Sequence, residues 1–433
     1  MLRDVVPGKD AVRGDVPPGN AVPEDTGRGN APPGDTGRGN VPPGDVGPGD
    51  TASPGATAGV GGEHREAALE RIAALAAEAE ELRRLPDELV GLLRAHGYLR
   101  MTLPRRHGGE ERDLPGLMAD LRVLAGYDAS VAWTVMVWAQ SQITMARLPP
   151  EAFESVLAGG PDVIVSASSA GEGEIAAGAG GVHVRGRWGF ASGVHHCRWI
   201  LVHCRPPGGD PRGVLLPMGE VEIEETWRVL GLRATGSDTV RARGITVPGH
   251  HLYDLRGTPP ALSPGPPRGT RRGTPSHAAT PHSLLPVRPA FALHMGAVAL
   301  GTAEGALRDL LDHVRERGAA GERAEHRLGL IRVRLDAAVA QLEAVAAVAW
   351  RLAAGGAPFP AGTAAAMAAS AAHAVRTATE VTGTSFAHLG SRALFDSSVT
   401  QRRLRDVLTI AQHANVSADA LGALGGTLLR ERP

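Results

Sequence analysis

Apolar residues recur at helical spacing from about residue 64 onwards. The positions are Leu69, Ile72, Ala76, Ala79 and Leu82. A repeat every three or four residues predicts an amphipathic helix. Pro86 suits the first turn of a second helix, and Gly97 suits the position just after that helix ends.

A third helical pattern covers 114–126 and leads directly into the apolar stretch "DASVAWTVMVWAQSQI". Either Asp128 or Ser130 would cap this fourth helix, because both side chains can accept a hydrogen bond from free backbone N–H groups. The stretch is apolar on nearly every side, so we expect it to be buried. Together these patterns predict an N-terminal helical domain over 63–160.

The pattern changes at about residue 161. Several short runs are rich in Val and Ile and are separated by Gly and Pro, as in "VIVSASS", "WILVHCR", "GVLLPM" and "VRARGITVP". Runs of this length and composition predict β-strands. We therefore expect an antiparallel β domain over 161–255.

Helical spacing returns over 289–433. The stretch "FALHMGAVALGTAEGALRDLLDHVRERG" predicts one long helix, and three more are predicted over 322–354, 361–388 and 399–430. Four long, Ala-rich helices in sequence predict a bundle. The string "GTAEGAL" lies inside a helical pattern, so it indicates close helix packing and not a phosphate-binding loop. The glycines that would allow such packing are Gly296, Gly301 and Gly305.

Two segments lack these patterns. In the first, residues 1–62, the decapeptide "DTGRGNAPPG" recurs as "DTGRGNVPPG". Repeats so rich in Gly, Pro and Asp cannot offset the entropy of ordering, which predicts a disordered tail. The second segment, 256–288, is rich in Pro, Gly, Arg and Thr, and it is either an exposed insertion or a mobile cover.

Composition narrows the class of protein. The chain has 433 residues, 42% of them hydrophobic, and a formal net charge of −1. A charge so close to zero gives no global attraction for nucleic acid or an anionic membrane. Two cysteines cannot form a disulfide framework, and the N-terminus has no apolar leader. These features predict a cytoplasmic protein without a membrane or nucleic-acid partner.

The string "RWGFASGVHHCRW" holds residue types that bind metals. His195, His196 and Cys197 are consecutive, and His203 and Cys204 follow. Zinc sites usually place such ligands at C-x2-C or H-x3-H spacing, which is missing here. In an extended strand His195 and His196 would point to opposite sides. We therefore predict no metal site and expect the cysteines to be small buried residues.

The order of these elements, with several local strings, resembles the acyl-CoA dehydrogenase superfamily. The strings are "LLRAHGYLRMTLPRRHGG", "GRWGFASGVHHCRW", "LGLRATGSDTVRARGITVP" and "RERGAAGERAEHR". The resemblance covers about residues 64–433. It implies an α+β fold that is mostly α, with an N-terminal helical domain, a central antiparallel β domain and a C-terminal four-helix bundle.

Within this superfamily the chain is more similar to the flavin-dependent two-component monooxygenases, the branch of the para-hydroxyphenylacetate hydroxylase oxygenases, dibenzothiophene monooxygenases and nitrososynthases. Many dehydrogenases of the superfamily carry a catalytic Glu eight residues after an Arg-Asp pair. The pair here is Arg405-Asp406, and the matching position is Ala414, which cannot take a proton. The string "FASG" matches the pattern that the monooxygenases favour.

The resemblance also implies site residues. Ser192 would face flavin N5, with Gly193 beside it and Trp188 and Phe190 as walls. His413, next to Ala414, would move a proton to or from the substrate, although a histidine that merely packs is the alternative. Trp133 would line the substrate pocket, but Ser141 stands where the aromatic hydroxylases often have a substrate histidine. Further candidates for flavin binding are Arg233, Thr235, Ser237 and Arg315, of which the first three could equally form a capped turn.

The function implied is that of an oxygenase component. It would receive reduced FMN or FAD from a separate flavin reductase, react with O2 through a C4a-hydroperoxyflavin, and oxygenate an aromatic, polycyclic or amine substrate. The resemblance also implies a homotetramer. An acyl-CoA dehydrogenase-like desaturase with its base elsewhere, and a non-enzymatic helical scaffold, remain the alternatives.

Overall fold

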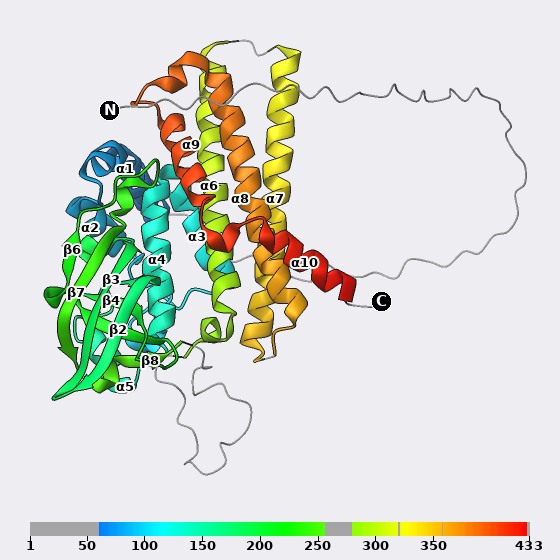
Figure 1. The fold of residues 1–433 in the computed structure, drawn as a ribbon. Coiled ribbons are helices and arrows are strands. Elements are labelled where there is room, and N and C mark those ends of the chain that lie inside the picture. The colour runs from blue at the N-terminus through cyan, green and yellow to red at the C-terminus, as the bar shows by residue number, and fades with distance from the viewer. Residues whose placement is uncertain (1–59, 256–278, 319–320, 357, 431–433) are drawn as a thin grey trace, which may run out of the picture. The chain divides into compact units, whose positions relative to one another are not determined.

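A computed structural model describes residues 60–255, 279–318, 321–356 and 358–430 of the chain (Figure 1). The predictions for residues 1–59 and 256–278 lie outside this part. Within it the predicted fold class is confirmed: a group of helices is followed by a β domain and then by long helices.

Five α-helices precede the β domain in the described part of the chain. They are α1 (Val60–Leu82), α2 (Asp87–Ala95), α3 (Leu114–Tyr127), α4 (Ala129–Met145) and α5 (Pro150–Leu157). Asp128, not Ser130, caps α4, because its carboxylate accepts a hydrogen bond from Val131 N at 2.9 Å. Gly97 follows α2 with a φ of 76°, in the left-handed region expected of a helix end. The sequence did not predict α5, which is only 8 residues long.

The β domain consists of two four-stranded sheets. The first has the order β1-β4-β5-β8 and the second β2-β3-β7-β6. Their bounds are β1 Val165–Ser168, β2 Ala170–Gly178, β3 Gly181–Ala191, β4 Trp199–Cys204, β5 Arg212–Pro217, β6 Glu222–Glu224, β7 Asp238–Val247 and β8 Leu252–Asp254. The expectation of a purely antiparallel domain is wrong in one detail, since β1 pairs with β4 in parallel.

The two sheets enclose one apolar core. Trp188 of β3, Val214 of β5 and Val240 of β7 belong to it and are fully buried. The outer face of the first sheet packs on Phe153 of α5. Both faces of the first sheet are therefore buried, one against the second sheet and the other against α5. Strand β1 of this sheet also contacts α4.

Five α-helices follow the β domain within residues 279–430 as far as the structure describes them. They are α6 (Val287–Glu316), α7 (Glu322–Ala354), α8 (Ala361–Leu389), α9 (Val399–Ile410) and α10 (Asp419–Arg430). The segment predicted as a loop up to residue 288 already forms a 3-10 turn at Pro281–Leu284 and the start of α6. The single helix predicted over 399–430 is wrong, because the chain leaves the helix after Ile410 and forms a second one from Asp419.

Helix α6 runs through the middle of the helical part and packs on α3, α4, α7, α8 and α9. Gly301 makes the contact with α3 possible, since a Cβ at this position would overlap the carbonyl oxygen of Arg122. Helix α4 lies between the β domain and α6 (Figure 1) and contacts both β1 and α6. It therefore carries side chains to the junction of the two parts.

Among the residues that the structure describes, two helices, α6 and α7, are long and apolar enough to cross a membrane by length and composition alone. In α6, 89% of the apolar window is buried inside the protein, as expected of a core helix; in α7 the share is 28%. This is weak evidence for a membrane span.

Candidate functional site

Ser192 lies just after strand β3, at a sharp change of backbone direction. Phe190 has a φ of 57° and Gly193 a φ of 67°. A phenylalanine in the left-handed region is uncommon and costs free energy, so such residues persist where the surrounding structure holds them, often at functional sites. The Ser192 side chain is held against α4, and the residue is 5% exposed.

Ser192 belongs to a chain of side-chain hydroxyls that points in one direction. Thr235 Oγ1 donates to the carbonyl oxygen of Leu232 at 2.8 Å. Its single proton is then used, so it accepts from Ser237 Oγ at 2.6 Å, and Ser237 accepts from Ser192 Oγ at 2.7 Å. Trp133 Nε1 donates to Ser192 Oγ at 3.2 Å. We call Ser192, Ser237 and Thr235 the hydroxyl chain.

The direction of the hydroxyl chain determines what Ser192 can offer a ligand. Its proton is given to Ser237, and one lone pair accepts the Trp133 N–H. A hydroxyl oxygen has a second lone pair. Ser192 therefore has one acceptor position left, which a donor N–H could fill.

A buried carboxyl supports the far end of the hydroxyl chain. Leu232 has a φ of 53°, and its backbone N–H donates to Asp406 Oδ1 of α9 at 2.6 Å. Its carbonyl accepts both Thr235 Oγ1 and Trp227 Nε1. Asp406 thus links α9 to the turn on which the hydroxyl chain ends.

Asp406 lies in an environment that disfavours its charge. Burial, together with the nearby carboxyl of Asp128, raises the pKa of Asp406 to about 7. Burial also raises the pKa of Asp128. The protonated form of Asp406 is consequently available near neutral pH.

His413 was expected on a helix, but it lies in the turn between α9 and α10. It is the N-cap of a 3-10 turn, Ala414–Val416, with extended backbone angles. Its ring lies 6.0 Å from the Trp133 ring and 6.2 Å from the Phe291 ring of α6, measured between centroids. The turn therefore brings His413 to the Trp133 that donates to Ser192.

The hydrogen bond that His413 makes assigns its proton. Nδ1 accepts from the backbone N–H of Asn415 at 3.2 Å. In the neutral ring the proton is then on Nε2. Burial lowers the pKa of His413, so the neutral form, with Nε2 as a donor, is favoured. In this form Nε2 can donate a hydrogen bond. Taking up a proton would require the Asn415 contact to break, because Nδ1 is the only ring nitrogen with a lone pair.

Phe190 offers an exposed aromatic surface beside Ser192. It is 66% exposed, and its ring lies edge-on to Trp227 with 5.8 Å between centroids. An exposed aromatic ring held at a strained backbone position suits a flat ligand.

Four other predicted residues lie elsewhere. Trp188 is fully buried between the two sheets and donates its indole N–H to His203 O. The Ser141 hydroxyl is buried and donates within α4 to Val137 O. Arg233 turns to Glu80 of α1 at 3.4 Å, and Arg315 pairs with Asp312 in the exposed last turn of α6. The structure brings none of these four side chains into the hydroxyl chain.

The histidines and cysteines of the opening motif point to separate partners. His195 and His196 lie in a 3-10 turn, not in the extended strand that was assumed. His195 Nε2 is 2.7 Å from Asp238 Oδ2, His196 Nε2 is 2.8 Å from Leu85 O, and Cys197 donates to Gly193 O. In the described part of the chain no group of three His, Cys, Asp or Glu side chains is arranged to hold a metal ion.

Two residues of the site were missed in the sequence. Asp406 was noticed only as part of the Arg-Asp pair, and Phe291 was not noticed. Asp406 occupies a buried position of the amphipathic helix α9, and a carboxylate at an inward-facing position is a signal for a specific partner. Phe291 carries no such signal, because an apolar residue on a core helix is expected.

Comparison with known proteins adds two family matches. Residues 61–149 match the acyl-CoA dehydrogenase N-terminal domain, and residues 293–418 match the acyl-CoA dehydrogenase C-terminal domain.

Several characterised relatives are oxygenases. The chain is 30% identical over 251 residues to the FADH2-dependent resorcinol hydroxylase oxygenase component of a Rhizobium species, and 31% over 212 residues to the flavin-dependent monooxygenase oxygenase subunit HsaA of Rhodococcus jostii. These alignments cover 57% and 47% of this chain. The chain spans 59% and 55% of those two relatives, little more than half. It is 26% identical over 349 residues to the indole-3-acetate monooxygenase of Pseudomonas putida, covering 78% of this chain and 85% of that one.

Solved structures match over a longer range. The 3-HSA hydroxylase from Rhodococcus sp. RHA1 superposes with a TM-score of 0.78 at 25% identity, and the HsaA monooxygenase from Mycobacterium tuberculosis with 0.76 at 26%. Each match covers 86% of this chain and 97% of the other.

Proposed function

We propose that this chain, which carries the N- and C-terminal domains of the acyl-CoA dehydrogenase family, is the oxygenase component of a flavin-dependent two-component monooxygenase. The relatives named as oxygenase components of flavin-dependent monooxygenases support this activity. The substrate class that follows is a small aromatic molecule, with polycyclic compounds and amines as the wider range.

One observation in the structure carries the proposal. Ser192 ends the hydroxyl chain with a free lone pair and is held by Trp133, whose ring neighbours His413. Reduced flavin carries a proton on N5, so an acceptor suits the reduced form better than the oxidised one. The position that matches the catalytic Glu of the dehydrogenases is Ala414, an exposed alanine, which cannot act as a base.

The residues present fit a flavin. Phe190 supplies an exposed ring at a strained position, Gly193 lets the chain turn tightly at Ser192, and Ser192 supplies the acceptor. When bound, reduced flavin supplies the electrons with which one atom of O2 is transferred to the substrate. The chain's own residues would hold and orient it, and the buried ring of Trp133 would exclude water from its side of Ser192.

His413 would donate a hydrogen bond from Nε2 to the substrate or to the oxygen atom that leaves as water, and it would transfer that proton only when Nδ1 takes up another one. Its Nε2–H is the group free to donate, because Nδ1 is held by Asn415 N–H. General acid catalysis by histidine proceeds from the protonated ring, so His413 would release its contact with Asn415 N–H when it takes up the proton that it later transfers.

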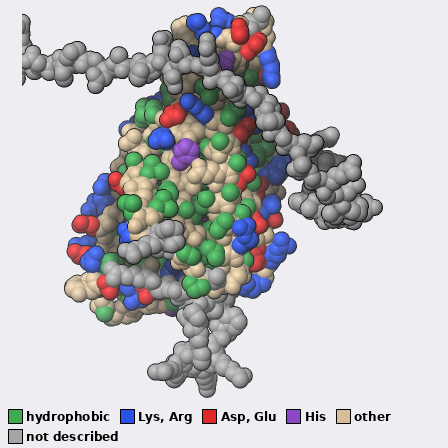
Figure 2. Space-filling model, turned by 90° about the vertical axis from the view of Figure 1, so that its right-hand side faces the viewer, with side chains coloured by type: hydrophobic (Ala, Val, Ile, Leu, Met, Phe, Trp, Pro, Cys, Tyr) green, Lys and Arg blue, Asp and Glu red, His purple; other side chains and the backbone are tan. Residues whose placement is uncertain are grey.

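The partner would be a flavin reductase that delivers reduced FMN or FAD, and a cytoplasmic location would suit that exchange. We further propose a homotetramer. Figure 2 shows hydrophobic side chains spread over the face that α7 and α10 form. The large hydrophobic residues that are exposed on these two helices are Leu330, Val333, Val348, Leu421, Leu428 and Leu429. Apolar surface of this kind usually marks an interface.

The activity is tested with the purified chain, a flavin reductase, NADH, ¹⁸O2 and a panel of phenols. We expect one ¹⁸O atom in the product, which mass spectrometry detects, only when reduced flavin is supplied. Bleaching of bound oxidised FAD by an acyl-CoA, with no oxygenated product, would instead identify a dehydrogenase.

A further inference from the structure

A hollow on the protein surface has no role in the function proposed above. It lies where the end of α1 meets the 3-10 turn Val194–His196 and the start of β7. Three arginines, a histidine and a tryptophan form most of its lining, and we call it the arginine hollow. It offers about 60 Å³ to water-sized molecules, the room of roughly four or five waters.

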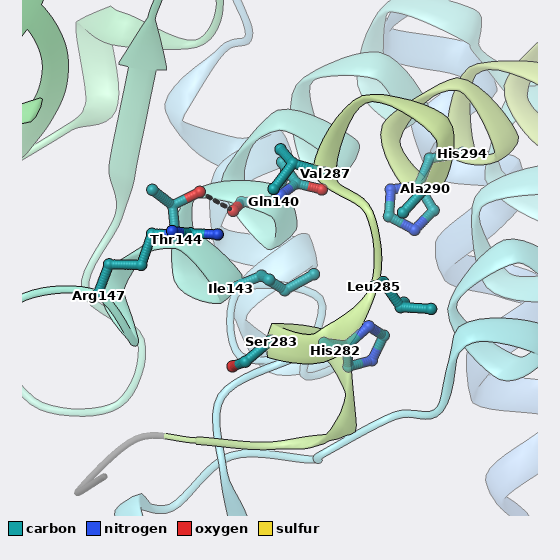
Figure 3. A pocket seen from close by; sticks show the side chains of 10 residues that line it. All are labelled: Gln140, Ile143, Thr144, Arg147, His282, Ser283, Leu285, Val287, Ala290 and His294. Carbon is teal, nitrogen blue, oxygen red and sulfur yellow. Dashed lines mark hydrogen bonds between the residues drawn. The ribbon is translucent and has the colours of Figure 1, made fainter. Parts of the chain in front are cut away.

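A cavity between α4 and α6 is smaller. Figure 3 shows Ile143 of α4 and Ala290 and His294 of α6 around it. It offers about 20 Å³, the room of roughly one or two waters. Of its ten lining residues only Arg147 is charged. The arginine hollow is larger than this cavity and collects more positive charge.

The three arginines of the hollow lack a carboxylate partner in the described part of the chain. Arg84 and Arg228 are exposed and form no ion pair there. The guanidinium group of Arg83 only donates to the backbone carbonyl of Trp227, at 3.3 Å. Glu225 also lines the hollow and is unpaired among the described residues. Three positive charges therefore face one free carboxylate, which leaves the hollow able to take an anion.

His195 has one ring nitrogen left for a ligand. Its Nε2 lies 2.7 Å from Asp238 Oδ2, and Asp238 Oδ1 accepts from the backbone N–H groups of Thr226 and Trp227. The carboxylate is thus satisfied and keeps a ring proton on Nε2. His195 Nδ1 makes no hydrogen bond within the described residues. A phosphate group suits Nδ1 in either state of the ring, because P–OH donates and P–O⁻ accepts.

Backbone features hold the arginine hollow in shape. Arg83 has a φ of 55°, which is uncommon for a residue with a long side chain. Gly236 packs against this turn, since a Cβ there would lie 2.9 Å from the His195 ring and 3.2 Å from the Arg83 carbonyl oxygen. Trp227 Nε1 donates to Leu232 O at 2.9 Å, which fixes the indole. Strained backbone persists where its surroundings hold it, often at ligand sites.

We propose that the arginine hollow binds the phosphate group of an organic phosphate monoester. The planar fork of an arginine donates two parallel hydrogen bonds to two phosphate oxygens. The room in the hollow suits a group of five heavy atoms. Leu82, which is 46% exposed, and the indole of Trp227 add an apolar wall for the organic part. This wall favours an ester over the free phosphate ion.

The test is calorimetry with phenyl phosphate and the full chain, without flavin and at low salt. Binding alone is measured, so the proposal stands or falls separately from the monooxygenase activity. Arg84→Gln and Arg228→Gln each remove a charged donor and should weaken binding about tenfold. Glu225→Gln removes the repelling carboxylate and should strengthen binding about two- to fivefold. Inorganic phosphate, which lacks the ring, should bind more weakly than phenyl phosphate.

Arg94→Gln is the matched control. Arg94 of α2 is also exposed and without an ion pair in the described part of the chain, but it does not line the hollow. This variant should bind phenyl phosphate like the wild type. Unchanged affinity in Arg84→Gln and Arg228→Gln, or an equal fall in all three arginine variants, would overturn the proposal. Tighter binding of inorganic phosphate than of phenyl phosphate would overturn the choice of an ester.

A further measurement uses the unaltered protein. In ¹⁵N NMR, phenyl phosphate should shift the ring signals of His195 and leave those of His294 unchanged. Unshifted His195 signals at saturating phenyl phosphate would contradict the site. A shift of the His294 signals alone would place the ligand in the cavity of Figure 3 and would also overturn the proposal.

Discussion

At the scale of single residues, Ser192 shows how a network can decide the role of one hydroxyl. Its proton is committed to Ser237, so it is an acceptor and not a donor. Ser192→Ala removes the acceptor and leaves the Trp133 N–H unpaired. Losing one such hydrogen bond costs about 1 kcal/mol, which is about a fivefold effect. We expect product per reduced flavin to fall by about that factor and hydrogen peroxide to rise; an unchanged ratio of the two would exclude the role.

His413 allows a structural role and a chemical one to be separated. His413→Ala should slow product formation about 10²–10⁴-fold, the range for a general acid, and should also cost about 1 kcal/mol of stability because the turn loses its cap. His413→Asn can still accept from Asn415 N–H but cannot transfer a proton. The Asn variant should therefore keep the wild-type free energy of unfolding, measured by chemical denaturation. Its rate of product formation, measured by single-turnover kinetics, should fall as in His413→Ala. Near-normal turnover in the Asn variant would reduce His413 to a cap.

Asp406 predicts a pH dependence of stability. Its pKa is about 7 in the folded protein and near 4 in the unfolded chain. Between these values the folded state holds a proton that the unfolded state has lost. Its contribution to stability is therefore fully present below about pH 4 and is lost as the pH rises through 7.

Asp406→Asn, which is always neutral, should remove this contribution while keeping an acceptor for Leu232 N–H. We compare the free energies of unfolding of the Asn variant and the wild type at pH 5 and pH 8. The difference between them should shift in favour of the Asn variant by on the order of 2 kcal/mol at the higher pH. Asp406→Ala should lose about 1–3 kcal/mol at both pH values, because the Leu232 N–H is left unpaired. A constant difference between Asn variant and wild type would contradict the raised pKa.

At the scale of elements, Gly301 tests the close contact of α6 with α3. Gly301→Ala would push a methyl group into the Arg122 carbonyl, so the helices must separate. Overpacking of this kind costs about 1–3 kcal/mol. Gly329→Ala on α7, where a Cβ meets nothing within 4 Å, should instead stabilise the protein by up to about 1 kcal/mol through helix propensity. Equal effects of the two substitutions in urea denaturation would count against the packing role.

Elements with a strong local signal were predictable from sequence, and those decided by tertiary contacts were not. Helix α4 has a cap and an uninterrupted apolar run, and α7 begins and ends where its pattern does. The break between α9 and α10 contains no Gly or Pro, so the pattern continues through it. The helix ends here because of contacts made by His413, which caps the next 3-10 turn and packs near the Trp133 ring. Trp188 was expected to line the flavin site but lies between the two sheets. Its position next to Ser192 in the sequence does not show on which face of β3 its side chain lies.

At the scale of the whole molecule, the apolar face over α7 and α10 is the feature that a single chain leaves unexplained. Val333 lies on α7 and is 65% exposed. If this face is buried between copies, Val333→Glu would place a charge in the interface without disturbing the fold of one chain. Val333→Leu keeps the site apolar and serves as its control.

Light scattering after size exclusion should give a tetramer for the wild type and Val333→Leu, and smaller species for Val333→Glu. Secondary structure by circular dichroism should be the same in all three, because an exposed helix position tolerates Glu. A wild type that is monomeric at micromolar concentration would show that these side chains are simply exposed, and a tetramer that survives Val333→Glu would move the interface to another face.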